Sequence, residues 1–262
     1  MLKQNLKIFL ILFLVLGFLV KNSSAEVLLS DGFESGLGNW SLSDPAIHWQ
    51  SGDFAHTGNY SHKVQDIGSL GEIATYNFTS PSNKKIYLSF WWLLDGATDT
   101  GGKLGRFVAG GTNAQFEIWW TNESHSIVVH HYDTTEEFPE CNVGVSRVHY
   151  ANVDIFDNNW HHFETFIEYN TPGVNDGVLR VWVDRPESAS FGDSAYLKVN
   201  DNDVRFINTG VCELYYSVLR LPTNLDARMQ PGYLYYDDVE LADELPSLDV
   251  TPPSAPVGLN II

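Results

Sequence analysis

The segment from Asn159 to Asp184, NWHHFETFIEYNTPGVNDGVLRVWVD, constrains the fold of this chain more than any other. Its first part, Trp160 to Tyr169, alternates apolar Phe163 and Ile167 with acidic residues, the period-two pattern of a half-buried strand. Its second part, Val178 to Asp184, alternates in the same way. The eight residues between them include one proline, two glycines and two asparagines, which favour turns. The segment therefore predicts a hairpin of an all-β sandwich.

Short strand-like segments with turn residues between them continue along the rest of the chain. They fall around 62–67, 72–78, 86–94, 105–109, 115–121, 126–132, 147–153, 196–199, 204–207 and 212–220, with a first strand from Val27 and a last strand over Tyr233–Leu241. No useful helical periodicity separates them. Short strands without alternating helices favour a sandwich or barrel over a parallel α/β sheet.

The two ends of the chain differ in composition from the middle. Residues 1–25 combine basic Lys3 and Lys7 with an apolar run and then small residues, which predicts a signal peptide and a secreted or cell-surface protein. An uncleaved membrane anchor is the alternative for this segment. Residues 26–243 are expected to form one sandwich domain, and the proline-rich residues 244–262 a linker or tail.

The formal net charge of −18 limits the partners that the chain can bind. So acidic a protein is a poor match for nucleic acid or for an anionic membrane surface, and we expect no membrane contact beyond the signal segment. A polyanionic ligand would require basic residues gathered in one place. An extracellular polysaccharide or glycoconjugate is the expected partner.

Only two cysteines occur, Cys141 and Cys212. In an exported chain a lone pair is most simply one disulfide, and two buried thiols or one reactive thiol are the alternatives. No cofactor is expected. The one candidate for a metal is a structural Ca²⁺ held by Asp31, Glu34, Asp237 and Asp238, because first and last strands tend to adjoin in a sandwich and Ca²⁺ prefers oxygen ligands. The alternative is that these acids face water in turns.

The hairpin pattern W-H-x-F-E…N-T-P-G-x-x-D-G-x-L-x-V-W-V-D resembles the jelly-roll domains of the concanavalin A-like lectin and glucanase group. Within that group it is most similar to alginate- and glucuronan-lyase-like polysaccharide lyases. The segment 101–111, GGKLGRFVAGG, resembles a glycine loop of those lyases. The opening D-x-F-E-x-G…W also resembles sugar-binding sandwich modules, and the tail T-P-P-S-A-P resembles the lead-in to a fibronectin type III domain. The resemblance implies a two-sheet antiparallel jelly roll.

The lyase resemblance implies a catalytic set made of Lys103, His130 and Tyr132. Lys103 matches the lysine of the glycine loop, and His130 and Tyr132 keep the one-residue spacing of a tyrosine pair in the family. Alternation along a strand places both on one face, and histidine has the pKa of a general base near neutral pH. The family's next strand carries an arginine, whereas this chain has Glu117 and Trp119 there.

Aromatic residues give a second, non-catalytic hypothesis. Alternation directs Trp91 outward from the strand 86–94 together with Tyr87 and Ser89, and Trp119 outward together with Glu117. Indole rings beside polar groups suit stacking against pyranose rings. Trp91, Trp119, Glu117 and Arg106 are therefore the candidate glycan-binding residues, and a core role for the aromatics is the alternative.

Two classes of function follow, and the sequence favours the first. It is a secreted, non-catalytic glycan-binding jelly-roll module, because the arginine that would neutralise a uronate is missing from the expected strand. The alternative is a polysaccharide lyase that cleaves uronic-acid-containing polysaccharides by β-elimination. A purely structural cell-surface domain is the third hypothesis.

Overall fold

The computed structural model describes residues 25–65, 73–95, 102–109, 115–121, 126–132, 147–153, 155, 157–206, 215–222 and 232–246. Fifteen strands and one short 3₁₀ helix, η1 (Pro45–Ile47), are found in these ranges. The strands are β1 Val27–Asp31, β2 Ser41–Leu42, β3 His48–Ser51, β4 Ser61–Gln65, β5 Ile73–Asn77, β6 Lys85–Asp95, β7 Gly102–Ala109, β8 Gln115–Thr121, β9 Ser126–Tyr132, β10 Arg147–Asn152, β11 His161–Glu168, β12 Gly177–Val183, β13 Leu197–Val204, β14 Tyr216–Pro222 and β15 Tyr233–Ala242.

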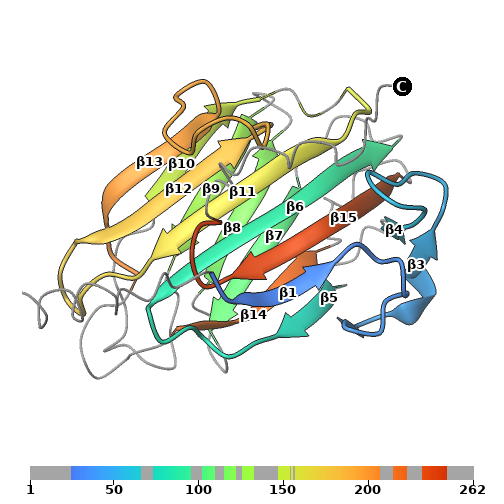
Figure 1. Cartoon of the computed structure of the whole chain (residues 1–262), viewed down its shortest axis with the longest axis horizontal. Helices are drawn as coiled ribbons and strands as arrows, with labels where there is room; N and C mark the ends of the chain where they lie inside the picture. The colour runs from blue at the N-terminus through green and yellow to red at the C-terminus, as the bar shows by residue number, and fades with distance from the viewer. Residues whose placement is uncertain are drawn as a thin grey trace, which may run out of the picture.

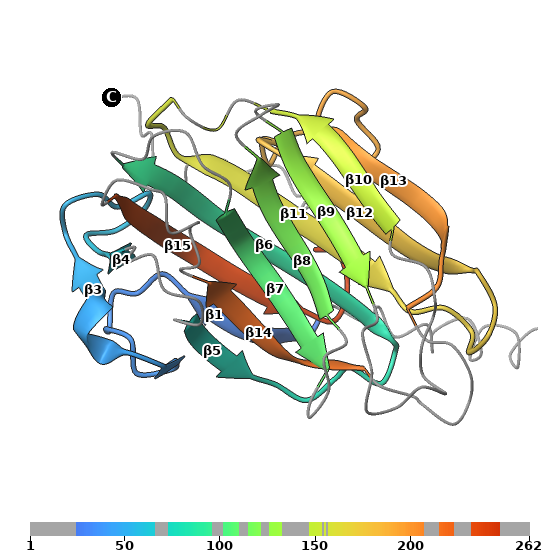
Figure 2. The ribbon, with the colours of Figure 1, turned by 180° about the vertical axis from the view of Figure 1, so that it is seen from behind.

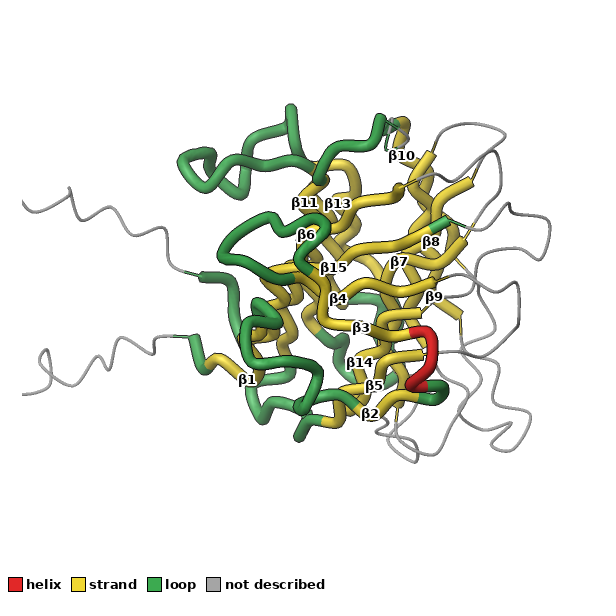
Figure 3. Tube along the Cα trace, turned by 90° about the vertical axis from the view of Figure 1, so that its right-hand side faces the viewer, coloured by secondary structure: helices red, strands yellow, loops and turns green. Residues whose placement is uncertain are grey.

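The strands form two antiparallel sheets packed face to face. Sheet A has the order β13-β12-β11-β6-β15-β4-β3, with β1 also paired to β15, and it faces the viewer in Figure 1. Sheet B has the order β10-β9-β8-β7-β14-β5-β2 and faces the viewer in Figure 2. Seen edge-on, the sheets form two layers, and the described loops project mainly on the side of sheet A (Figure 3). The predicted all-β jelly-roll sandwich is confirmed.

The hairpin that most constrained the sequence lies next to the centre of sheet A. β11 pairs with β12 on one side and with β6 on the other. Phe163, Ile167 and Leu179 are completely buried between the sheets, as their alternation predicts. The face opposite them is not open to solvent, however. Glu164 and Trp182 on that outer face are 1% and 0% exposed, because the segment after β12 covers them.

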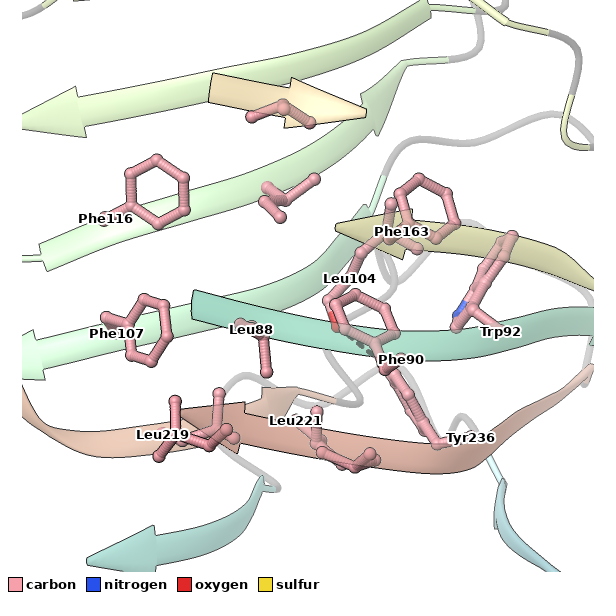
Figure 4. Close-up of a cluster of buried hydrophobic side chains, with 14 of the residues drawn as sticks. Leu88, Phe90, Trp92, Leu104, Phe107, Phe116, Phe163, Leu219, Leu221 and Tyr236 are labelled. Atoms are coloured by element: carbon pink, nitrogen blue, oxygen red, sulfur yellow. Dashed lines mark hydrogen bonds between the residues drawn. The ribbon is translucent and has the colours of Figure 1, made fainter. Parts of the chain in front are cut away.

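Aromatic and aliphatic side chains from both sheets fill the core. Phe90, Trp92 and Tyr236 of sheet A meet Leu104, Phe107 and Phe116 of sheet B in the interior (Figure 4). Burying such side chains is the main favourable contribution to folding, roughly 1.5–3 kcal/mol for each. The strand pairing therefore fixes two outer faces of the sandwich, one for each sheet, on which polar chemistry can be built.

A histidine pair lies within this apolar interior. His48 Nδ1 and His62 Nε2 are 2.9 Å apart, and the two rings stack with their centroids 5.1 Å apart. Burial lowers the pKa of His48 to about 4 and that of His62 to about 3. Both imidazoles are therefore neutral at neutral pH.

Three details of the predicted elements differ in the structure. The predicted strand 196–199 is the start of a longer strand, β13, which runs to Val204, and the predicted strand 204–207 shares only Val204 with it. The short strands β2 and β3 were not predicted. Residues 244–246, assigned to the tail, contact the sandwich: Glu244 pairs with Lys85 at 3.0 Å, and Leu245 packs on the outer face of sheet A.

Residues 1–24 and 247–262 lie outside the described ranges, so the signal peptide and most of the predicted tail stay predictions. Cys141 and Cys212 also lie outside these ranges, and their disulfide likewise stays a prediction. Within the part of the chain that the structure describes, no helix has the length and hydropathy needed to cross a membrane.

Candidate functional site

One cross-strand row on the outer face of sheet B gathers charged and titratable residue types. In register, Arg220 of β14 lies opposite Arg106 of β7, Arg106 opposite Glu117 of β8, and Glu117 opposite His130 of β9. The row continues to Val148 of β10, whose side chain is 42% exposed. Because neighbours in a row share one face of the sheet, the row belongs to the outer face.

Core residues on the same strands confirm this assignment of the face. Phe116 and Ile118 of β8, and Ile127 and Val129 of β9, are buried between the sheets. The positions that alternate with them, 117 and 119 on β8 and 130 and 132 on β9, therefore belong to the other face of the sheet. Four residues that the sequence singled out, Glu117, Trp119, His130 and Tyr132, thus occupy outer-face positions on two adjacent strands.

A β-bulge in β7 adds two cations to the same face. The register shifts between Lys103 and Gly105, and both Leu104 and Phe107 are fully buried. The irregularity changes the alternation, so that Lys103 and Arg106 are both left on the outer side, half-buried. Lys103 lies in register with Trp119, one row from the arginines. Gly105, one of the glycines of the resembling loop, lies at the bulge, where an added Cβ would be 3.5 Å from the ring of Phe90.

Arg220 is the residue of this face that the sequence reasoning missed. It lies on β14, in the apolar run V-L-R-L, and only the pairing of β14 with β7 brings it beside Arg106. Its alternation with buried Leu219 and Leu221 was the available signal. That signal predicts an outward arginine but does not predict its neighbour.

The two arginines repel one another. Burial, and then the charge of Arg106, lower the pKa of Arg220. The lowered value still leaves a guanidinium charged at neutral pH. The Arg220 Nε is buried, and within the described ranges it has no hydrogen-bond partner. Two like charges held side by side favour an anion that bridges them.

Trp91 lies on the opposite side of the molecule, on the outer face of sheet A. The predicted direction out of the core is correct, but the residue does not share a face with Trp119. Two imidazole rings stack on its indole: His56 with ring centroids 3.6 Å apart and His162 with centroids 4.7 Å apart. The stacking surface that a sugar would need is taken up by these histidines. Tyr87 and Ser89, predicted to face outward with Trp91, do so but are buried under the loops.

Beneath these rings the outer face of sheet A holds a buried ion pair. Arg185 donates from Nε and Nη2 to the two carboxylate oxygens of Glu164, at 2.7 and 2.5 Å, and the Tyr87 hydroxyl donates to Glu164 Oε1 at 2.6 Å. Ser89 Oγ lies 2.7 Å from His162 Nε2. Burial lowers the pKa of His162, so that it is neutral; its Nδ1 lies 3.3 Å from the carbonyl oxygen of Arg185, and the tautomer that donates there accepts from Ser89 at Nε2.

A cavity of about 810 Å³ opens above this network. Its wall includes Trp91, Trp160, Phe191 and Pro246, and its polar lining includes Glu164, Arg185, Asp184, Glu187, Asp238 and Glu240. A second bulge helps to form it: the register of β15 shifts between Asp237 and Glu240, and Asp238 has a φ of 45°. Sequence reasoning assigned His162 and Trp160 to the structural hairpin pattern and did not predict the cavity.

The four acids predicted to hold calcium are distributed among separate hydrogen-bond networks. The first and last strands do adjoin, with Asp31 opposite Val239. The Asp31 carboxylate, however, accepts from Phe33 N and Trp40 Nε1, and Glu34 accepts from Asn59 N and Tyr60 N.

Asp237 accepts from the backbone N–H of His56, and Asp238 lies 2.7 Å from His56 Nδ1. Burial raises the pKa of Asp237 to about 6. Among the residues that the structure describes, no three His, Cys, Asp or Glu side chains are grouped to hold a metal.

Comparison with known proteins identifies the fold. No protein-family model matches the chain, and no curated protein sequence matches it significantly. Among solved structures, the endo-β-1,4-glucuronan lyase of the fungus Trichoderma reesei is similar with a TM-score of 0.52 at 13% identity, over 86% of this chain and 92% of the lyase.

The alginate lyase vAL-1 from a Chlorella virus is similar with a TM-score of 0.53 at 15% identity, over 85% of this chain and 100% of that chain. The cellulose-induced protein Cip1 gives a TM-score of 0.51 at 14% identity, over 82% and 97%. The chain therefore has the jelly-roll fold of these proteins. At such identities the likeness concerns the fold alone.

Proposed function

We propose that this chain is a polysaccharide lyase that cleaves a uronic-acid-containing polysaccharide by β-elimination on the outer face of sheet B. The observation that carries the proposal is the register pair of Arg106 and Arg220, with Lys103 one row away. The chain carries a formal charge of −18, yet it places three cations on one face of two neighbouring strands, β7 and β14. A local concentration of cations is the condition under which so acidic a protein can bind a polyanion.

The arginine pair could neutralise the uronate carboxylate, the role of the family's arginine that is missing from the strand with Glu117 and Trp119. A uronate carboxylate withdraws little electron density while it is charged, so its neutralisation is needed before the neighbouring C5 proton becomes acidic. Two guanidiniums side by side offer bidentate donors to one carboxylate. In the ligand-free protein the pair is repulsive, so an incoming carboxylate relieves a cost as well as forming new hydrogen bonds. Arg220 takes the place of the arginine missing from β8.

The elimination needs one base and one proton donor. A base removes the C5 proton, the electron pair forms the C4–C5 double bond, and the C4–O glycosidic bond breaks with its electrons moving to the leaving oxygen, which takes up a proton. His130, Tyr132 and Lys103 are the candidates for these proton transfers. Lys103 belongs to β7 and the other two to β9, with β8 between these strands, and His130 lies in the same register row as the arginine pair.

The structural neighbours support the substrate class. Two of them are, by name, a glucuronan lyase and an alginate lyase, and both share the sandwich over more than four fifths of this chain. Binding without catalysis is the competing function. Glu117, opposite Arg106 in register, is the feature that favours it, because a carboxylate there would weaken the attraction for a uronate.

The proposal is tested by ultraviolet absorbance with alginate and glucuronan as substrates, since each elimination leaves a conjugated double bond. We expect absorbance to rise with at least one of them. Arg220→Ala should lower kcat/KM by about a hundredfold or more, because removing an electrostatic group that acts in the transition state commonly costs that much. Arg180→Ala is the matched control. Arg180 is also an arginine on a strand, but it lies on sheet A, where its side chain donates to Asn202.

The results separate the two functions. Absorbance growth that Arg220→Ala abolishes and Arg180→Ala leaves unchanged supports the lyase. Retention of uronans on the protein without any absorbance growth identifies a binding module instead. Neither growth nor retention, or equal activity in the Arg220→Ala variant, overturns the proposal.

A further inference from the structure

The cavity on the outer face of sheet A is a second candidate binding site, separated from the arginine pair by the whole thickness of the sandwich. We propose that it binds a short oligosaccharide that carries amino groups, with Trp160 stacking against one sugar ring and Glu240 pairing with an ammonium group. The inference does not depend on lyase activity, because no residue of the sheet B face lines this cavity.

Trp160 provides the stacking surface. It is half-buried, immediately precedes β11 and lines the cavity. Its one ring contact among the described residues is with His56, at 6.0 Å between centroids and 67° between planes, so no ring stacks flat on its indole. Trp91, in contrast, is stacked by two histidines. A pyranose C–H face can therefore meet Trp160 but not Trp91.

Three of the five acids that line the cavity have a side-chain partner. Glu164 is paired with Arg185, Asp238 Oδ2 lies 2.7 Å from His56 Nδ1, and Asp184 Oδ2 lies 3.0 Å from His161 Nδ1. Two acids remain, and Glu240 is the more buried of them. Within the described ranges its carboxylate makes no hydrogen bond or ion pair, and burial followed by the charge of Glu164 raises its pKa. A half-buried, unpaired carboxylate beside another acid favours a cationic group and repels a uronate.

The distance between the two residues sets the length of the ligand. Glu240 is in register with Ser89, and Ser89 with Glu164, so that Glu240 belongs to the row four residues along β11 from Trp160. Four strand residues span about 13 Å along the strands, and β15 lies two strands from β11, roughly 10 Å across the sheet. The ligand must therefore contain more than one ring. A linear oligosaccharide of amino sugars combines the ring faces, the positive charge and the length.

Titration calorimetry on the full chain tests this assignment with four probes: a β-1,4-linked glucosamine tetramer, its N-acetylated counterpart, a lysine tetramer and a glucuronate tetramer. We expect the glucosamine tetramer to bind at least about tenfold more tightly than the acetylated one, the gain typical of a charge-assisted hydrogen bond. Glu240→Gln should remove that difference. Trp160→Ala should weaken binding of both sugars by roughly two- to tenfold.

Two matched variants serve as controls. Trp49→Ala removes another partly exposed tryptophan of sheet A, and Glu168→Gln neutralises another acid of the same sheet; neither residue lines the cavity. Both should bind like the wild type, and thermal melts should show that all four variants are folded. Equal binding of the amino and acetylated sugars, preferential binding of glucuronate, or lysine-tetramer binding unaffected by Trp160→Ala would each overturn the proposal.

Discussion

The two outer faces of the sandwich handle charge in opposite ways. On sheet A, a buried carboxylate and a guanidinium neutralise one another under a cover of aromatic rings and loops. On sheet B, two guanidiniums lie opposite each other in register, and burial together with their mutual repulsion lowers the pKa of Arg220. A pair that satisfies itself stabilises the fold, whereas a pair that repels itself prepares the surface for an anion. Under the proposed function, the same strand geometry serves structure on one face and recognition on the other.

The largest expected effect tests the structural role of the sheet A pair. Arg185→Met leaves the fully buried Glu164 carboxylate without its bidentate partner. Breaking one side of a buried pair usually costs about 3–5 kcal/mol of unfolding free energy. Urea unfolding of this variant should show a loss of that size.

Two further variants sharpen the interpretation. Arg185→Met combined with Glu164→Leu should recover most of the loss, because no unpaired charge is left buried. Arg180→Met, at a half-buried arginine outside this ion pair, should change the unfolding free energy by less than about 0.5 kcal/mol. A loss below about 1 kcal/mol in the Arg185→Met variant would mean that the Arg185–Glu164 pair contributes little to stability. The proposed difference between the two outer faces would then be wrong.

An acid-sensitive element between the two faces should give the next largest effect. His48 and His62 have folded pKa values of about 4 and about 3, below the unfolded value near 6.5. The unfolded chain therefore binds more protons than the folded one in this range, and stability falls as the pH drops below about 6.5. Each histidine contributes at most about 1.4 kcal/mol per pH unit.

The direction of the histidine contribution to stability can be measured by comparing variants, because other groups change stability with pH in the opposite direction. Asp237, whose pKa is raised to about 6, favours the folded state as the pH falls from that value. Melting temperatures of the wild type and of His62→Phe between pH 7 and 4 isolate the histidine term. The wild type should lose stability more steeply than the variant. Parallel curves would show that the histidine pair does not contribute to the loss of stability in acid. Any loss of ligand binding at low pH would then have to come from residues on the two outer faces.

Sequence alternation was sufficient for a sandwich or barrel of short strands and for part of the sheet B face, whereas the jelly roll followed from the resemblance of the hairpin motif. Phe163 and Ile167 predicted the core side of β11, and the spacing of His130 and Tyr132 predicted a shared face of β9. Both are properties of a single strand. The alternation could not say which strands become neighbours, so Arg220 was missed although its own outward position was readable.

Alternation also fails to predict what covers an outward residue. Trp91 was grouped with Trp119 as a sugar-stacking residue, but the two lie on different sheets, and histidines stack on Trp91. Glu164 follows the outward pattern of β11 and is nevertheless 1% exposed, because Arg185 and the segment after β12 enclose it. Contacts of this kind depend on loops that carry no periodic pattern, and only the tertiary structure supplies them.

The smallest expected effect tests the recognition role of the sheet B pair through stability alone. If Arg106 and Arg220 repel one another in the ligand-free protein, Arg220→Met should increase the unfolding free energy by roughly 0.2–1 kcal/mol, the range for cross-strand pairs. High salt should reduce the difference in unfolding free energy between the wild type and Arg220→Met, since the screening length falls to about 3 Å at 1 M. Arg180→Met, which removes an arginine that contacts Asn202, should give no such gain.

A ligand completes this test. Uronate oligosaccharides should raise the melting temperature of the wild type and leave that of Arg220→Met nearly unchanged, because a ligand stabilises only the state that binds it. A variant that gains stability while losing the response to uronate would show that the pair is kept at a cost for its ligand. If Arg220→Met instead destabilises the fold by more than about 1 kcal/mol, the arginine serves the sheet, and the two faces differ less than their charges indicate.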